Sequence, residues 1–380
     1  MKSFRKYISA AILFASASFA FSATEVNIFA LNPEAEETVT NGLNDFAKEI
    51  MVAAPEAATQ MNVWQEAHIG NLFPSIHPHF GGGLSIGGTA INMTGFKTAA
   101  VEVANQFNTI SAAMLGDTID PVIFEKIPEK FVLPSASLDL RLGGFVMPFD
   151  IGIFVIMTNP NIFAVHLNDP SSIYNMSQAI NFKFLGFDGS IDYFSIGGDF
   201  RIRLLEEDGA VPAVSVGAGY AYTKGNIKAH AQNESEILST TQTTTIDMGM
   251  GYQTQVIFIQ GQVSKDLSIV SLFAGARGIL SNTTCDWSWA FQTDNDTVDA
   301  LDFYDNDNNG SVTATGLSDT HKNGKWDFSG IQPQVFAGLG FNLPKTQLTF
   351  SVCADVRSFF DKGNYTDFIW SGAFGLHFKI

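Results

Sequence analysis

The end of the chain reads Phe368-Ile-Trp-Ser-Gly-Ala-Phe-Gly-Leu-His-Phe-Lys-Ile380, and it carries the clearest pattern in the sequence. From Phe368 to Ile380 every second residue is apolar or glycine, while most of the residues between them are small or polar. A period of two is typical of a β-strand that has one face in an apolar environment. The stretch therefore predicts an amphipathic strand at this end of the chain.

The same alternation recurs in four earlier stretches, 137–142, 193–204, 214–222 and 348–357. The apparent strands run to about 10–16 residues, which is longer than usual in soluble sheets and close to the length that crosses a bilayer when tilted. The faces opposite the apolar ones carry charges of both signs, as a wet barrel lumen would. The charged positions are Asp139, Arg141, Asp199, Arg201, Arg203, Asp355 and Arg357.

An alternating sheet also fits a soluble β-sandwich. The strand lengths and the charged faces favour an all-β fold of another kind, a transmembrane antiparallel β-barrel of about 12–14 strands, since bacterial barrels favour even numbers. Lipid cannot satisfy the hydrogen bonds of an open sheet edge. We therefore expect the last strand to pair with the first.

The N-terminus has the regions of a secretory signal peptide. Lys2, Arg5 and Lys6 are basic, residues 7–21 are largely apolar, and small residues follow, which predicts a signal peptide over residues 1–22. No later run of about 18 apolar residues offers a helical membrane anchor. We expect the exported chain in the bacterial outer membrane, with outer-membrane lipid and the barrel-assembly machinery as its partners.

The composition disfavours several classes of protein. Of 380 residues, 38 are acidic and 21 basic, so the formal net charge is −17 and a nucleic-acid partner is not expected. There is no G-x-S-x-G, P-loop or H-E-x-x-H motif, so an outer-membrane hydrolase has no motif behind it and no enzyme is predicted. The two cysteines, Cys285 and Cys353, are too few for a disulfide scaffold, and the sequence leaves open whether they pair.

Helical patterns occur in two places. An apolar stripe at spacings of three and four predicts a helical segment within 23–75, either a plug or a periplasmic segment, with Pro55 as a breaker. The stripe consists of Val39, Leu43, Phe46 and Ile50. The barrel then occupies 76–380 and begins with a Gly-rich strand, and a second stripe predicts a helical insert at about 96–116.

The last residues resemble the C-terminal assembly signal of bacterial outer-membrane barrels, with Gly375 and Phe378 in place and Ile380 where Phe is usual. The wider pattern of signal peptide, helical segment, Gly-rich first strand and many long strands resembles the long-chain fatty-acid transporter family of outer-membrane channels. Asn32-Pro33 is a loose counterpart of the Asn-Pro pair in that family's hatch. The resemblance implies an N-terminal hatch that plugs the barrel and an internal path for hydrophobic substrates.

The charged side chains of the expected lumen have two interpretations. Four arginines, Arg141, Arg201, Arg203 and Arg357, either form a constriction that orients an anionic head group or pair with acids on neighbouring strands and keep the interior satisfied. Outside this set, Trp287 and Trp289 alternate near a strand end, which predicts an aromatic girdle at the membrane interface.

The segment at about 293–327 is acidic, lacks a hydrophobic period and is expected to be a long extracellular loop. Asp305-Asn-Asp-Asn-Asn-Gly310 matches the first half of an EF-hand-type calcium loop, and a related frame begins at Asp319. The bidentate Glu and the flanking helices of an EF-hand are missing. The alternatives are weak calcium binding and a solvated acidic loop, with the candidate ligands Asp305, Asp307, Asn309, Asp319 and Asp327.

The function predicted from these features is an outer-membrane barrel channel or transporter for small molecules, hydrophobic ones included. The alternative is a structural or adhesive surface protein that uses the long acidic loop. A transporter needs a path through or past the plug, whereas an adhesive protein can have a sealed interior. The position of residues 39–51, inside or outside the barrel, is the observation that bears most on this choice.

Overall fold

The computed structural model describes twelve parts of the chain: residues 33–60, 62–69, 78–114, 125, 127–144, 148–160, 177–184, 187–237, 240–295, 311–317, 332–357 and 369–379. The expected signal peptide lies outside these residues. So do the five candidate calcium ligands and Ile380.

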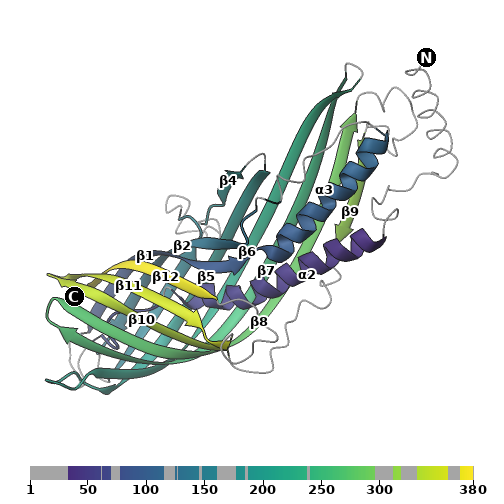
Figure 1. Cartoon of the computed structure of the whole chain (residues 1–380). Helices are drawn as coiled ribbons and strands as arrows, with labels where there is room; N and C mark the ends of the chain where they lie inside the picture. Colours follow the sequence, from purple (N-terminus) through teal and green to yellow (C-terminus); the bar gives the residue numbers. More distant parts are fainter. Residues whose placement is uncertain are drawn as a thin grey trace, which may run out of the picture.

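Ten antiparallel strands close into a barrel (Figure 1). They are β1 (His79–Asn92), β2 (Lys130–Gly143), β3 (Phe149–Met157), β5 (Phe187–Leu205), β6 (Ala213–Ile237), β7 (Thr240–Leu267), β8 (Val270–Asn295), β10 (Gln332–Leu343), β11 (Thr346–Asp355) and β12 (Trp370–Lys379). Two pairings close the ring, β8 with β10 and β12 with β1. The expectation that the last strand pairs with the first is confirmed, with a register from Gly81 opposite Lys379 to Thr89 opposite Ser371.

The expected count of about 12–14 barrel strands is too high. The sheet has 12 strands, but β4 (Ile180–Phe184) pairs only with β5 and β9 (Ser311–Leu317) only with β8, so neither belongs to the ring. Strand length explains the difference. β6, β7 and β8 have 25, 28 and 26 residues, so the same length of chain forms fewer strands than the alternating patterns indicated.

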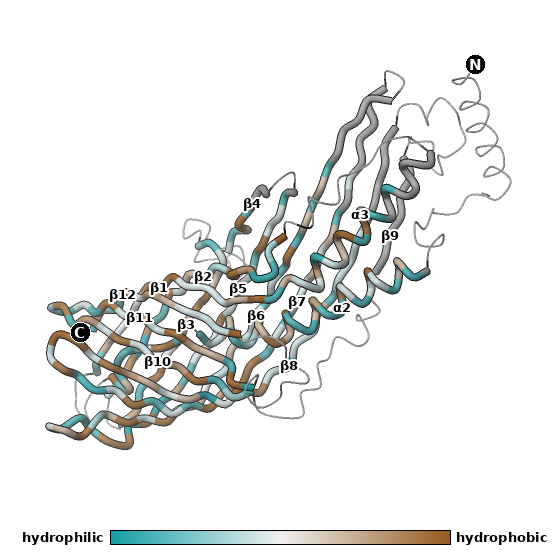
Figure 2. Tube along the Cα trace, in the orientation of Figure 1, coloured by the Kyte–Doolittle hydropathy of each residue, from teal (hydrophilic) through white to brown (hydrophobic). Residues whose placement is uncertain are grey.

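An apolar band surrounds the barrel, as the alternating hydropathy along its strands shows (Figure 2). On β7 the exposed apolar positions run from Ile257 to Leu267. Ten residue steps span about 33 Å along a strand, and a tilt of about 40° reduces this to about 25 Å, the height of the apolar band of a membrane barrel. On the inner face of the same strand, Gln260, Gln262 and Ser264 are buried. The barrel is therefore transmembrane, with lipid outside and a polar interior.

The two ends of the barrel differ. At one end, two-residue turns at 268–269 and 344–345 join neighbouring strands, and Ser268 and Lys345 adopt the positive φ that such tight hairpins favour. Strand β1 begins and strand β12 ends at this same mouth, which we call the short-turn mouth. At the other end, residues 223–237 of β6, 240–256 of β7 and 280–295 of β8 continue past the ring as the extension (Figure 1).

Two helices, α2 (Pro33–Thr59) and α3 (Thr94–Met114), lie side by side along the inner face of the extension (Figure 1). The apolar stripe of α2 packs into one core with inward side chains of β7 and β8, such as Met250 and Trp287. Burial of each large apolar side chain contributes about 1.5–3 kcal/mol. The helices meet closely where a Cβ on Gly42 would lie only 2.7 Å from the carbonyl oxygen of Gly95. Neither helix has a stretch long and apolar enough to cross a bilayer.

Three boundaries differ from those predicted. Helix α2 continues through Pro55 to Thr59, because its last turns are held by the barrel around them. The helical insert begins two residues earlier than expected, at Thr94. The segment 293–327 is not entirely loop, since β8 extends to Asn295 and residues 311–317 add a strand to it.

Candidate functional site: the plugged lumen

The lumen is occupied by the chain's own N-terminal part, residues 50–60 of α2 and its end together with residues 62–69, which we call the plug. Every residue from 50 to 60 is buried, whereas α2 before residue 50 has an exposed polar face that includes Glu37 and Lys48. The helix ends inside the barrel, and the following segment runs on in extended or bent form toward the short-turn mouth. Residues 39–51 therefore lie partly in the extension and partly at the entrance of the lumen.

Arg277 of β8 binds the C-terminal end of α2. Its guanidinium donates hydrogen bonds to the carbonyl oxygen of Thr59 at 2.8 Å and to that of Asn62 at 3.3 Å. The last carbonyls of a helix lack partners within the helix and carry a partial negative charge, so a buried arginine there is favourable. The rings of Phe258 and Phe336 lie 4.9 and 5.3 Å from the same guanidinium. This arginine fixes the depth to which α2 enters the lumen.

Glu56 is the only acidic side chain of the plug's helical part among the described residues, and it is fully buried. Its carboxylate accepts hydrogen bonds from the Ser371 hydroxyl of β12 at 2.7 Å and from the Gln334 amide of β10 at 2.6 Å. Burial raises the pKa of Glu56 to about 7, against the effect of these two hydrogen bonds. The closing strand β12 and β10, two strands away from it, thus hold one side chain of the plug.

A network of four charges surrounds the start of the extended segment. Arg141 of β2 donates to Asp150 of β3 and, at 2.7 Å, to Asp199 of β5. Arg201 of β5 binds both oxygens of Asp150, at 2.9 and 2.8 Å. The amide of Asn62 in the plug donates to Asp199 at 3.1 Å, so the plug joins the network. All four charged side chains are buried, and such groups are stable in a barrel only when they are paired.

The barrel wall also holds the extended segment through its backbone. The amide of Gln262 donates to the carbonyl oxygen of Trp64 at 2.6 Å, and the hydroxyl of Ser215 donates to that of Ala67 at 2.6 Å. The N–H of Ala67 donates to Ser264 at 2.9 Å, and the N–H of Ile69 donates to Asp150 at 2.9 Å. Wall side chains therefore satisfy backbone groups that would otherwise be unpaired in a buried segment.

The seven predicted lumen charges lie on the inner face but do not form one constriction. Arg141, Asp199 and Arg201 belong to the network around Asn62. Asp355 binds Arg357, two residues away. Asp139 lies 3.6 Å from His377 of β12. Arg203 binds Glu206 at the short-turn mouth, at 3.2 Å.

Sequence reasoning missed four residues that matter here: Glu56, Asp150, Arg277 and His377. Asp150 alternates with Gly152 and Phe154 on the inner face of β3, so nothing near it marks it as the acid between two arginines. Glu56 follows Pro55, the residue that was expected to end the helix. His377 was visible as one of the two strongly polar residues of the terminal alternation, with Lys379.

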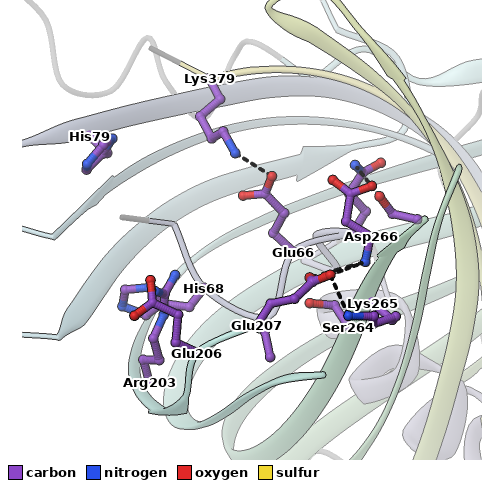
Figure 3. A pocket seen from close by; sticks show the side chains of 13 residues that line it. Glu66, His68, His79, Arg203, Glu206, Glu207, Ser264, Lys265, Asp266 and Lys379 are labelled. Carbon is purple, nitrogen blue, oxygen red and sulfur yellow. Dashed lines mark hydrogen bonds and ion pairs between the residues drawn. The ribbon is translucent and has the colours of Figure 1, made fainter. Parts of the chain in front are cut away.

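At the short-turn mouth the plug and the wall enclose a cavity of about 270 Å³ (Figure 3). Figure 3 shows its lining side chains, which come from the plug, from the turn after β5 and from the ends of β1, β5, β6, β7, β8 and β12 at this mouth. The charged and titratable ones are Glu66, His68, His79, Arg203, Glu206, Glu207, Lys265, Asp266 and Lys379. We call it the mouth cavity.

Other predicted features have plain outcomes. Trp287 and Trp289 are buried against α2, and the Trp287 indole donates to Asn44 at 2.9 Å, so they do not form an interfacial girdle. Their strand continues past the membrane into the extension, where the inner face is apolar.

Cys285 and Cys353 are free, buried thiols. Within the described part of the chain, no group of three or more His, Cys, Asp or Glu residues is placed to hold a metal ion. Calcium binding by the acidic segment stays a prediction.

These features define the class of the protein as a transmembrane β-barrel whose lumen is plugged by its own N-terminal segment. Comparisons with protein-family models and with curated proteins find no match to the chain. Solved structures that resemble it include the transport unit of the autotransporter AIDA-I from Escherichia coli, with 10% identity, 89% of this chain and 98% of that chain covered and a TM-score of 0.28.

Two further structures are similar. The translocator domain of the autotransporter NalP from Neisseria meningitidis has 7% identity, with 80% of this chain and 90% of that chain covered and a TM-score of 0.30. A FadL homologue from Pseudomonas aeruginosa has 8% identity, with 85% and 97% covered and a TM-score of 0.26. All three likenesses are loose, and one of them is to a FadL homologue. The fold assignment itself comes from the strand register and the apolar band.

Proposed function

We propose that this protein is an outer-membrane channel for small molecules and that the plug is its gate. The observation that carries the proposal is the course of residues 50–69 through the lumen, bound to the wall on several sides. A segment in that position restricts passage while it is seated. The proposal assigns no catalytic role to any residue.

The outer membrane is the proposed location for three reasons. The first 22 residues have the pattern of a signal peptide. The apolar band has the height of a membrane barrel, and the ring leaves no open edge toward lipid. Closed barrels of this kind are typical of outer membranes.

The bonds that hold the plug favour a gate over a permanent core. Several are single hydrogen bonds to backbone carbonyls, each worth about 0.5–1.5 kcal/mol, so they can break one after another. The surfaces between α2 and the extension, with Met248, Met250 and Trp289, are apolar and packed against each other while the plug is seated. A shift of α2 would expose them, so small hydrophobic molecules remain within the proposed substrate class.

A reversible lock on the plug tests the gate. Val63 of the plug and Cys353 of β11 lie in one buried cluster, so Val63→Cys provides a disulfide partner for the native thiol. In a Cys285→Ala background, oxidation should lower solute flux in proteoliposomes and planar-bilayer conductance, and reduction should restore both. The matched control carries Val63→Cys with Cys353→Ala and should not respond to oxidation.

The alternative function predicts a different result. If the interior is sealed and the protein is a structural or adhesive surface protein, flux should be negligible in the reduced and the oxidised state alike. Flux that is high and equal in both states, with the disulfide verified by mass spectrometry, would also contradict the gate.

A further inference from the structure

The mouth cavity has a mixture of charges that is close to balanced. Its lining includes four carboxylates, Glu66, Glu206, Glu207 and Asp266, and three basic groups, Arg203, Lys265 and Lys379. Acidic and basic groups lie near one another in this lining, as the pairs Lys379–Glu66 and Lys265–Glu207 show (Figure 3). Such a lining has no preference for a purely cationic or a purely anionic molecule. It matches a molecule that carries both charges.

One ion pair of the rim is well suited to exchange with a ligand. Lys379 of β12 binds Glu66 of the plug, and their side chains are 41% and 24% exposed. Ion pairs with this exposure contribute about 0–1 kcal/mol, so replacing one costs little. Glu66 keeps its position without the lysine, because the Gln347 amide also donates to it at 2.9 Å. A ligand ammonium can therefore take the place of the lysine, and the freed lysine can bind a ligand carboxylate.

Two of the other carboxylates of the rim, Glu207 and Asp266, are held more firmly. Glu207 accepts hydrogen bonds from the backbone N–H of Asp266 at 3.0 and 3.1 Å and binds Lys265 at 3.0 Å. Asp266 in turn accepts from the N–H of Ser268 at 2.8 Å. These contacts fix the turns around the cavity. The Glu66–Lys379 pair is the exchangeable one that joins the plug to the wall, whereas Arg203 and Glu206 belong to one turn.

His68 of the plug adds a polar group to the cavity wall. It is 3% exposed, and neither ring nitrogen has a hydrogen-bond partner among the residues that the structure describes. Burial lowers the pKa of His68 to about 4, so the ring is neutral at physiological pH, with one nitrogen as donor and the other as acceptor. Buried polar groups without partners are rare in native structures, and a ligand is one way to satisfy them.

We infer that the mouth cavity binds a small zwitterion of the amino-acid type, with its ammonium group on Glu66 and its carboxylate on Lys379. The volume of about 270 Å³ lies just below the usual range of about 300–1,000 Å³ for ligand pockets, so the ligand is small. The inference rests on the proposed function in that it names a substrate class for the same passage. Because Glu66 belongs to the plug, the bound ligand would bridge the gate and the closing strand.

Calorimetry with three related probes tests the site on the full-length protein folded in detergent. The probes are L-alanine, N-acetyl-L-alanine, which lacks the ammonium group, and L-alaninamide, which lacks the carboxylate. L-Alanine should bind saturably and each analogue about tenfold or more weakly, as expected for the loss of a charged hydrogen bond. Glu66→Gln should abolish the preference over the acetylated analogue, and Lys379→Gln the preference over the amide.

The matched control is Lys48→Gln, which removes an exposed lysine paired with Asp45 near the middle of α2, on the part of the helix that lies outside the plug. It should bind all three probes as the parent protein does. Heat-modifiable mobility in electrophoresis shows that each variant is folded. The site is refuted if L-alanine gives no saturable heat, if all three probes bind alike, or if Glu66→Gln and Lys379→Gln behave like the control. Flux through the reversible lock is a separate readout, so a failed binding site and a failed gate are distinguishable.

Discussion

The carboxylate of Glu56 and the hydroxyl of Ser371 lie 2.7 Å apart, and this hydrogen bond joins the plug to the strand that closes the barrel. Ser371 pairs with Thr89 of β1 across the seam, so the bond forms where the first and the last strand meet. Seating of the plug and closure of the ring are therefore physically linked. A change on either side should affect both.

Ser371→Ala should destabilise the folded barrel by about 1–3 kcal/mol, because it leaves a buried carboxyl group without one of its two side-chain donors. The measurement is the urea dependence of heat-modifiable mobility. Ser288→Ala, on the exposed outer face of β8, serves as the control and should leave the midpoint unchanged. Identical midpoints for the two variants would contradict the role of this bond.

The plug should be held more loosely as the pH rises from about 5 to 8. The pKa of Glu56 is raised from 4.5 to about 7, so the folded state favours the protonated acid, and that stabilisation is lost as the pH passes through about 7. The groups that act on it are Arg277, which favours ionisation, and Asp355, which opposes it. The upper limit of the effect is about 3 kcal/mol.

Glu56→Gln provides the test, because glutamine keeps the shape without the titration. In a background without native cysteines, the rate at which the thiol of Val63→Cys reacts with a thiol reagent should rise with pH more steeply than ionisation of that thiol explains. When Glu56→Gln is added, the rate divided by the thiolate fraction should not change with pH. The same pH dependence in both proteins would assign it to another group.

Asp150→Asn should destabilise the barrel by about 3–5 kcal/mol, because it leaves the buried guanidiniums of Arg141 and Arg201 without their shared carboxylate. Asp247→Asn, which alters an exposed carboxylate on the outer face of the extension, should cost less than about 1 kcal/mol. Urea unfolding of both variants gives the comparison. A small loss for Asp150→Asn would show that the network is not needed for folding.

Removal of residues 378–380 should block assembly. Phe378 pairs with Gly82 of β1 and with Thr346 of β11, so the truncation opens both sides of the seam at the short-turn mouth. The truncated chain should accumulate in the periplasm and lose heat-modifiable mobility, as cell fractionation and electrophoresis would show. Normal insertion would mean that the terminal pattern is not an assembly signal.

The alternation of side chains was enough to predict the barrel and its closure. Leu138 and Leu140 face lipid while Asp139 and Arg141 face the lumen, as their positions in the sequence indicate. The strand count was not predictable in the same way, because the period of two continues without a break from the membrane into the extension. The end of the membrane is marked only on the outer face, where the side chains of β7 change from apolar at Ile257 to polar at Gln255 and Gln253.

The site was less predictable than the fold. Period and composition identify which side chains face the lumen, but they do not show which of them meet across the barrel. Arg141 and Asp199 are 58 residues apart in the sequence and come together only because β3 lies between β2 and β5. The plug's contacts were hidden for a further reason, since the wall binds backbone groups that every residue has.

The wall hydrogen-bonds the backbone of Trp64, Ala67 and Ile69. These bonds affect which substitutions the plug and the wall can each tolerate. Hydrogen bonds to the main chain depend on the length and the extended conformation of the bound segment, not on the identity of its side chains. Between residues 64 and 69 this leaves freedom only where the wall does not bind the side chain, because the side chains of Trp64, Gln65 and Glu66 also contact it. On the wall, Gln262, Ser215 and Asp150 cannot change freely. An extended segment of equal length that keeps the Trp64, Gln65 and Glu66 side chains, supplied on the same helix, should therefore seat in the barrel.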